Sequence, residues 1–114
     1  KKKIFLILSV PEMNINPRKY YIRSKILKNN NLENDENIRL DMTTHKMKNY
    51  EFVKSIKKIK NNSLFIFDPA SVLCNKFNCS SFQNNKLLYR DKSHISKKNS
   101  FIFYDKFFNF LEIK

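Results

Sequence analysis

Glycine is absent from this sequence of 114 residues. Without glycine, the chain cannot contain a P-loop, a dinucleotide-binding fingerprint or a glycine-built oxyanion turn. Some turns still need a backbone with positive φ, and asparagine is the next most tolerant residue for that conformation. The sequence has 16 asparagines, so we expect Asn to take the positions where glycine would usually stand.

Long hydrophobic runs are also missing. The first apolar run, Ile4 to Val10, has the length of a strand and is far shorter than the roughly 18 residues that a membrane span needs. It lacks the small-residue cleavage pattern of a signal peptide. Because the chain opens directly on this run, without an initiator methionine, we expect it to be a segment of a longer protein.

Arginine and acidic residues are scarce. Arginine supplies 4 of the 23 basic residues, the acidic residues number 10, and the net charge is +13. The lysines accompany 16 Asn and 12 Ile, which indicates a compositional background more than a phosphate-binding surface, since arginine is preferred for bidentate base and phosphate contacts. We therefore expect solvated lysines and no nucleic-acid partner. A basic binding module for anionic glycans or nucleic acid is the alternative.

The two cysteines, Cys74 and Cys79, stand in the pattern C-x4-C. With no second cysteine pair and only two histidines, this is a poor zinc signal, and we predict neither a metal nor a cofactor. A disulfide is possible if the intervening residues turn back, and it would contribute about 2 kcal/mol and indicate an oxidising compartment. The spacing alone leaves a disulfide and free thiols equally open.

Hydrophobic periodicity predicts strands that alternate with helices. We expect buried strands at residues 3–10 and 63–68, each ended by a proline, and a short extended piece at 86–89. Amphipathic helices are expected at residues 18–29, 43–60 and 96–113; Thr43 or Thr44 would cap the second and Ser96 the third. This order predicts an α/β fold in which helices cover a parallel sheet.

Three polar loops follow the strand-like segments, and they are Pro11–Glu12, Asp68–Pro69 and Asp91–His94. Active sites of parallel α/β sheets lie beyond the carboxyl ends of the strands. We therefore expect these loops to converge at one edge of the sheet.

Asp91 and His94 are the candidate catalytic residues. A histidine is a general base for a serine nucleophile when a carboxylate holds its other ring nitrogen, and an aspartate three residues earlier can do this within one tight turn. By itself D-x-x-H is weak, and a surface turn is the alternative. Glu12 could line the same site, although a solvated loop glutamate is favoured, and His45 is interpreted as a surface histidine.

An ordered set of motifs surrounds this pair. Asp68-Pro69 ends a strand, Leu73-Cys74 and Cys79 follow, and then comes Leu88-Tyr89-x-Asp91-x-x-His94-Ile95-Ser96. Together with the opening "SVPEMNINPRKYYIRS", this set resembles the last part of the SGNH-hydrolase-like domains fused to membrane acyltransferases, which O-acetylate bacterial surface polysaccharides. The resemblance covers essentially the whole chain, with residues 32–60 the least distinctive.

The resemblance implies the C-terminal half of a three-layer α/β/α (flavodoxin-like) fold, so that residues 1–114 form one partial domain. It implies that His94 is the base and Asp91 its orienting carboxylate, and it favours a Cys74–Cys79 disulfide because the family's domains face the periplasm or cell exterior. The partners implied are an acyl donor, a surface polysaccharide and an upstream membrane acyltransferase domain. The location implied is the extracytoplasmic face of the membrane, as part of a membrane protein.

Two departures from the family pattern stand out. Asn99 replaces a family glycine, which we interpret as asparagine at a conformationally permissive position. The family's G-D-S nucleophile block and glycine oxyanion block cannot lie in a chain without glycine, so we expect them upstream and expect this chain alone to be inactive. A secreted carbohydrate acetylesterase with the same half-domain is the alternative enzyme.

Overall fold

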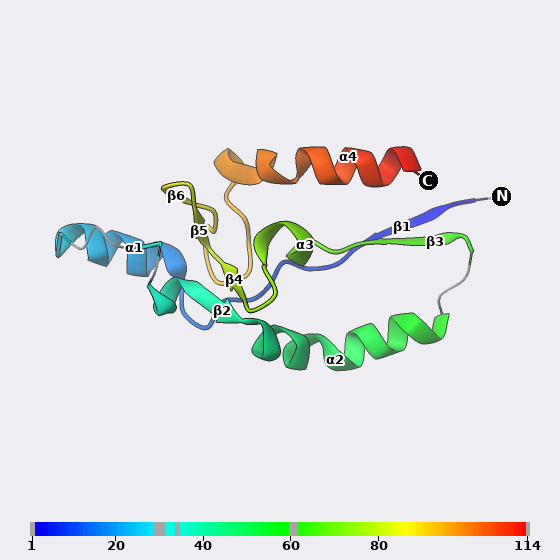
Figure 1. Cartoon of the computed structure of the whole chain (residues 1–114), viewed down its shortest axis with the longest axis horizontal. Coiled ribbons are helices and arrows are strands. Elements are labelled where there is room, and N and C mark those ends of the chain that lie inside the picture. The colour runs from blue at the N-terminus through cyan, green and yellow to red at the C-terminus, as the bar shows by residue number, and fades with distance from the viewer. Residues whose placement is uncertain (1, 29–31, 34, 60–61, 114) are drawn as a thin grey trace.

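The computed structural model describes residues 2–28, 32–33, 35–59 and 62–113. The molecule measures 56 × 27 × 21 Å, with a radius of gyration of 15.8 Å, against about 13 Å for a compact chain of this length. Figure 1 shows a three-layer arrangement at one end. Helix α4 (Tyr104–Ile113) lies on one side of strands β1 (Ile4–Ile7) and β3 (Leu64–Phe67), and helix α2 (Met42–Ile59) lies on the other. The shape is elongated because helix α1 (Pro17–Ile26) extends from the opposite end.

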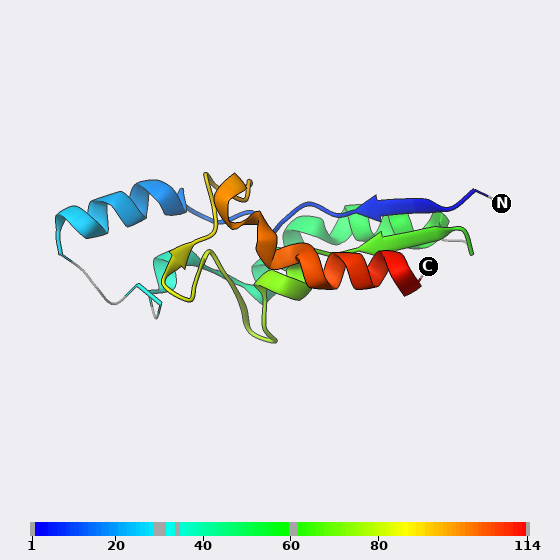
Figure 2. The same cartoon turned by 90° about the horizontal axis from the view of Figure 1, so that it is seen from above.

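Strands β1 (Ile4–Ile7) and β3 (Leu64–Phe67) pair in parallel, with Ile4 opposite Leu64 and Ile7 opposite Phe67. Both strands run toward the middle of the molecule (Figure 2). The chain that connects them passes through α1 and α2. A parallel pair needs such a crossover, and a helix usually supplies it. The α/β class and the parallel sheet predicted from the sequence are thus confirmed.

The burial predicted for the first strand is wrong. Ile4 and Ile7 are 56% and 54% exposed, and Phe5 is 39% exposed. The sheet formed by β1 and β3 is narrow, and β1 has one neighbouring strand among the described residues. Helix α4 covers one face of the sheet through aromatic contacts of Phe110 with Phe5 and Phe67. The sequence of β1 is apolar enough for a strand buried on both faces, but its side chains are only partly covered.

The last predicted helix consists of two segments. A 3₁₀ helix, η2 (Lys97–Phe103), follows Ser96, and the α-helical part begins only at Tyr104. Ser96 holds the N-cap position but its side chain makes no capping hydrogen bond. The segment boundaries were therefore predicted correctly, but the tight first turns were not.

Helix α1 (Pro17–Ile26) is capped at its N-terminus, but its apolar side chains are largely exposed. The side chain of Asn16 accepts hydrogen bonds from the amides of Arg18 and Lys19, and Pro17 occupies the first turn. The prediction of a buried face is wrong at Ile22 and Ile26, which are 49% and 75% exposed. Its predicted end at residue 29 lies outside the described residues.

Helix α2 is capped two to three residues earlier than predicted. The carboxylate of Asp41 accepts a hydrogen bond from the amide of Thr44, so Asp41 is the cap and neither Thr43 nor Thr44 is. The predicted end at residue 60 lies outside the described residues. The three residues before the helix form an unpredicted strand, β2 (Arg39–Asp41), which pairs antiparallel with β4 (Asn78–Ser80).

A hairpin confirms the role predicted for asparagine. Strands β5 (Phe82–Gln83) and β6 (Lys86–Leu87) are joined by Asn84 and Asn85, whose φ angles are 52° and 59°. A two-residue hairpin with positive φ at both positions usually contains glycine. Lys28 also has a positive φ, 56°, so asparagine is not the sole residue used this way.

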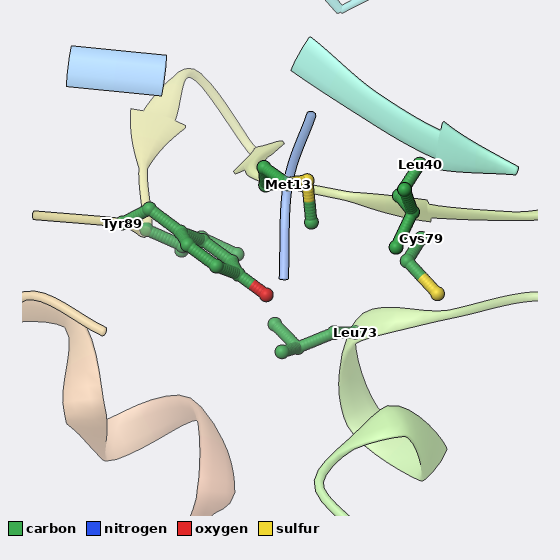
Figure 3. Close-up of a cluster of buried hydrophobic side chains, with 6 residues drawn as sticks. Met13, Leu40, Leu73, Cys79 and Tyr89 are labelled. Carbon is green, nitrogen blue, oxygen red and sulfur yellow. The ribbon is translucent and has the colours of Figure 1, made fainter. Parts of the chain in front are cut away.

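The main buried cluster lies at the centre of the molecule, between the sheet and α1. Figure 3 shows Met13 from the loop after β1, Leu73 from the short helix α3 (Ala70–Leu73), and Tyr89 close together. The other members are Leu40, Cys79 and Leu88. This cluster joins the ends of both parallel strands to the segment that carries Asp91 and His94.

A second, smaller cluster under α1 and the hairpin contains Leu32, Ile38 and Phe82. Within the described residues, no helix is both long and apolar enough to cross a membrane.

Candidate active site

Asp91 and His94 lie in a short turn between two antiparallel segments. Tyr89 forms an isolated bridge with Ile95, and the amide of Arg90 donates to the carbonyl oxygen of His94 over 2.8 Å. The amide of Ser96 donates to the carbonyl oxygen of Leu88 over 2.8 Å. These bonds close the base of the turn and fix the backbone on both sides of the pair.

The carboxylate of Asp91 holds the imidazole of His94 through one ring nitrogen. His94 Nδ1 lies 2.9 Å from Asp91 Oδ1 and 3.0 Å from Oδ2. Asp91 Oδ1 also accepts the backbone amides of Ser93 and His94, each over 2.9 Å. The aspartate therefore shapes the turn and orients the ring at the same time.

This geometry determines which histidine nitrogen is available for chemistry. Because Nδ1 faces a carboxylate, it carries the proton, and Nε2 is the basic nitrogen. Nε2 makes no hydrogen bond with any described residue, and the His94 side chain is 61% exposed. Ser93 Oγ lies 3.4 Å from Nδ1, on the nitrogen already held by Asp91, so Ser93 is not placed as the nucleophile.

The turn keeps Asp91 ionised. The amide hydrogen bond from Ser93 and the contact with the His94 ring hold the pKa of the Asp91 carboxyl below its usual range. Both interactions favour the charged form of a carboxylate. The pair therefore has the charge arrangement that stabilises an imidazolium when Nε2 accepts a proton.

Two hydrogen bonds tie the turn to the loop after β1. The amide of Met13 donates to the carbonyl oxygen of Lys92 over 2.8 Å, and the buried hydroxyl of Tyr89 donates to the carbonyl oxygen of Pro11 over 2.6 Å. Two of the three polar loops are thus adjacent, as predicted. The third loop joins them indirectly, because Asp68 precedes α3 and Leu73 of that helix packs in the central cluster.

The other sequence candidates, Glu12 and His45, have their described polar partners in α2. Glu12 is exposed, and its described ionic partner is Lys48 of α2, with Nζ and Oε1 3.9 Å apart.

His45 was interpreted as a surface residue, and this is wrong because it is 9% exposed. It lies on the inner side of α2, where Asn49 one turn later donates to its carbonyl oxygen over 2.8 Å and contacts Nδ1 at 3.2 Å. Burial lowers the pKa of His45, while the charge of Asp68 opposes that shift.

Asn99 has a different role from the one predicted. It lies in the 3₁₀ helix η2, and the residues with positive φ in the described chain do not include it. Its buried side-chain amide donates to the carbonyl oxygen of Leu87 over 2.6 Å and to Ser96 Oγ over 3.2 Å. The residue therefore holds the start of η2 against the hairpin by hydrogen bonding, and backbone tolerance is not required.

The cysteines form the disulfide that the family resemblance favoured. The Cys74 and Cys79 sulfur atoms are bonded across an antiparallel bridge that links the end of α3 to β4. Cys79 is fully buried in the central cluster. Among the residues that the structure describes, no group of three or more His, Cys, Asp and Glu side chains is arranged to hold a metal ion.

Two roles near the pair were not predicted: the hydrogen bond of the Tyr89 hydroxyl, although Tyr89 belongs to the ordered motif set, and the ionic contact of Arg90. Tyr89 is the link between the two loops, and Arg90 Nε lies 3.9 Å from Asp91 Oδ2. Tyr89 belongs to the apolar piece "LLY", so its hydroxyl gave no sign of a long-range partner. A buried tyrosine usually finds a partner for its hydroxyl, and this rule could have marked it.

A carboxylate-held histidine in a loop beyond the strands of a parallel sheet is an arrangement also found in domains where a histidine acts as base for a serine. Comparison with protein families makes this specific: residues 1–101 match the SGNH domain that is fused to AT3 domains. The chain belongs to that family. Comparison with curated proteins and with solved structures gives no significant match.

Proposed function

We propose that this chain is the C-terminal half of an SGNH-type O-acyltransferase domain that transfers an acetyl or other acyl group to a cell-surface polysaccharide. The observation that carries the proposal is the pairing of His94 Nδ1 with both oxygens of Asp91 while Nε2 stays available. Membership of a family whose domains are fused to AT3 acyltransferase domains supports transfer as the reaction. The Cys74–Cys79 disulfide supports an extracytoplasmic location, because such bonds persist in oxidising compartments.

The reaction has two steps with the same base. First, a serine hydroxyl from the N-terminal half attacks the carbonyl carbon of the acyl donor while His94 Nε2 takes its proton. The donor's leaving group departs with that proton, which leaves an acyl-serine. Next, Nε2 takes the proton of an acceptor sugar hydroxyl, the sugar oxygen attacks the acyl carbon, and the serine oxygen recovers the proton.

Asp91 stays ionised throughout and stabilises the imidazolium that each step forms. The developing oxyanion would be stabilised by backbone and side-chain donors of the upstream blocks, including the amide of the serine. Ser93 cannot replace that serine, because its hydroxyl approaches Nδ1 and not Nε2. We therefore expect the 114-residue chain alone to give no turnover.

The test uses the full-length protein and an activated acetyl ester, followed by transfer to polysaccharide. His94→Ala should lower turnover by about 10²- to 10⁴-fold, the usual contribution of a positioned general base. Ser93→Ala is the matched control from the same turn and should keep its activity. Full activity of His94→Ala, or loss of activity in Ser93→Ala, would remove the assignment.

A further inference from the structure

A concave surface lies next to the turn that carries Asp91 and His94, between α1, strand β6 and the 3₁₀ helix η2. It has a volume of about 400 Å³. We call it the cationic groove and define it by four basic and two aromatic side chains, which are Arg18, Lys86, Arg90, Lys98, Tyr21 and Phe101.

The side chains that line the cationic groove carry charge of one sign, although Arg90 Nε also lies 3.9 Å from Oδ2 of Asp91, which is not among the lining residues. None of the residues that line it is acidic. Two of the four arginines in the whole sequence line this groove, Arg18 from α1 and Arg90 from the turn. The abundance of lysine accounts for lysines anywhere on the surface, but it does not account for two scarce arginines at one place. Arginine is the side chain that pairs bidentately with carboxylate and phosphate groups.

The aromatic side chains give the groove an apolar wall beside its charges. Phe101 is 47% exposed, and Lys86 Nζ lies 5.1 Å from the centre of its ring. Tyr21 packs against Phe82 of the hairpin at 5.9 Å between ring centres, which fixes its position. A partly exposed aromatic ring next to cations suits a ligand that has both an apolar face and negative charge. An acidic sugar has both.

The groove adjoins the candidate base. Arg90 lines it, precedes Asp91 in the chain, and donates its amide to the carbonyl oxygen of His94 over 2.8 Å. Ser96, two residues after His94, also lines it. A polymer chain lying in the groove would therefore pass beside the turn that carries Asp91 and His94.

We propose that the cationic groove binds an acidic sugar unit of the acceptor polysaccharide, with Arg18 and Arg90 pairing with its carboxylate or phosphate. This inference rests on the proposed function and adds the substrate class to it, namely glycans that carry negative charge. A glycan fits better than a nucleic acid, because the groove lies beside the turn that holds the proposed base for acyl transfer to a sugar hydroxyl. Nucleic-acid binding is therefore an outcome of the test.

The first experiment measures binding to the full-length protein, in the wild-type and the His94→Ala form. The probes are an oligogalacturonate, the same oligomer with its carboxyl groups reduced to alcohols, a glycerol-phosphate oligomer and a single-stranded DNA of equal charge. We expect the oligogalacturonate or the glycerol-phosphate oligomer to bind at least tenfold more tightly than the neutral oligomer. The difference between the two acidic probes tells whether carboxylate or phosphate is the preferred group.

The second experiment compares Arg18→Gln with Arg23→Gln, an exposed arginine of the same helix that does not line the groove. Loss of one charge-assisted bidentate contact should weaken binding of the acidic probe about tenfold in Arg18→Gln. Arg23→Gln should change it less than twofold. Lys98→Gln and Lys58→Gln form a second matched pair of groove and exposed helix α2 lysines.

Three results would overturn the proposal: equal binding of the acidic and the neutral oligomer, equal effects of Arg18→Gln and Arg23→Gln, or DNA binding tighter than that of every glycan probe. Because binding is also measured in the His94→Ala form, it does not depend on turnover. If the acidic probes do not bind the groove, the assignment of His94 as the base is unaffected. If His94 is not the base, the binding result is unaffected.

Discussion

Removal of the Cys74–Cys79 disulfide should destabilise the domain by an amount that its short loop predicts. The two cysteines are 5 positions apart in the sequence. On the chain-entropy model, closing a loop of about this length contributes about 2 kcal/mol at 25 °C. Substitution of both cysteines by alanine removes in addition a buried sulfur at Cys79, worth about 1 kcal/mol on the scale of a buried methylene.

Two perturbations separate these contributions. A reductant opens the bond and keeps both sulfur atoms in place, so it should cost about 2 kcal/mol. The double variant Cys74→Ala/Cys79→Ala should cost about 3 kcal/mol in total. Within these 114 residues the reductant has one bond to act on, because they contain no other cysteine.

The assay is urea unfolding of the complete SGNH domain, followed by far-UV circular dichroism. With a slope of about 2 kcal/mol per molar urea, reduction should lower the midpoint by about 1 M. A thiol titration must find two more free thiols in the treated wild-type sample than in the Cys74→Ala/Cys79→Ala variant treated in the same way. An unchanged midpoint in that sample would refute the reasoning, because the bond would then not constrain the unfolded chain in the way the loop length predicts.

The remaining predictions concern two buried groups. Tyr89→Phe keeps the ring but leaves the carbonyl oxygen of Pro11 without its partner, so the urea midpoint should report a loss of about 1–3 kcal/mol. Tyr104→Phe, at a position 54% exposed, is the control, and an equal loss there would contradict the role of the hydrogen bond. His45 has a folded-state pKa below its ordinary value of 6.5, so the unfolded chain takes up the proton first and stability should fall as the pH drops below 6.5. Urea midpoints measured against pH should show a smaller fall in His45→Gln than in wild type, and identical profiles would exclude His45 as the source.

Local sequence patterns were enough for several features of the site. The spacing of Asp91 and His94 predicted that one turn could hold both, and the structure brings them to 2.9 Å. The absence of glycine predicted asparagine at positive φ, which Asn84 and Asn85 confirm. Such features depend on groups a few residues apart, and the backbone of one turn determines their distance.

Features that depend on distant segments were not predictable in this way. His45 is surrounded by lysines in the sequence, yet its helix turns it toward Asp68 and the loop after β1, so it is buried. The exposure of β1 depends on how many strands flank it, and hydrophobicity does not report that number. The side-chain amide of Asn99 donates to the carbonyl oxygen of Leu87, which belongs to another element, so spacing within the chain gave no sign of this contact.

The sequence by itself determined the residue types and spacings of the candidate site: an aspartate three residues before a histidine, two cysteines five positions apart, and no glycine for a nucleophile block within these residues. It determined these because they rest on residue types and short spacings. Only the tertiary structure decided that the turn is held to the loop after β1 by Tyr89 and Met13, and that Arg18 and Arg90 line one groove beside it. Those contacts join segments more than 70 residues apart, and packing of the central cluster, not local preference, brings such segments together.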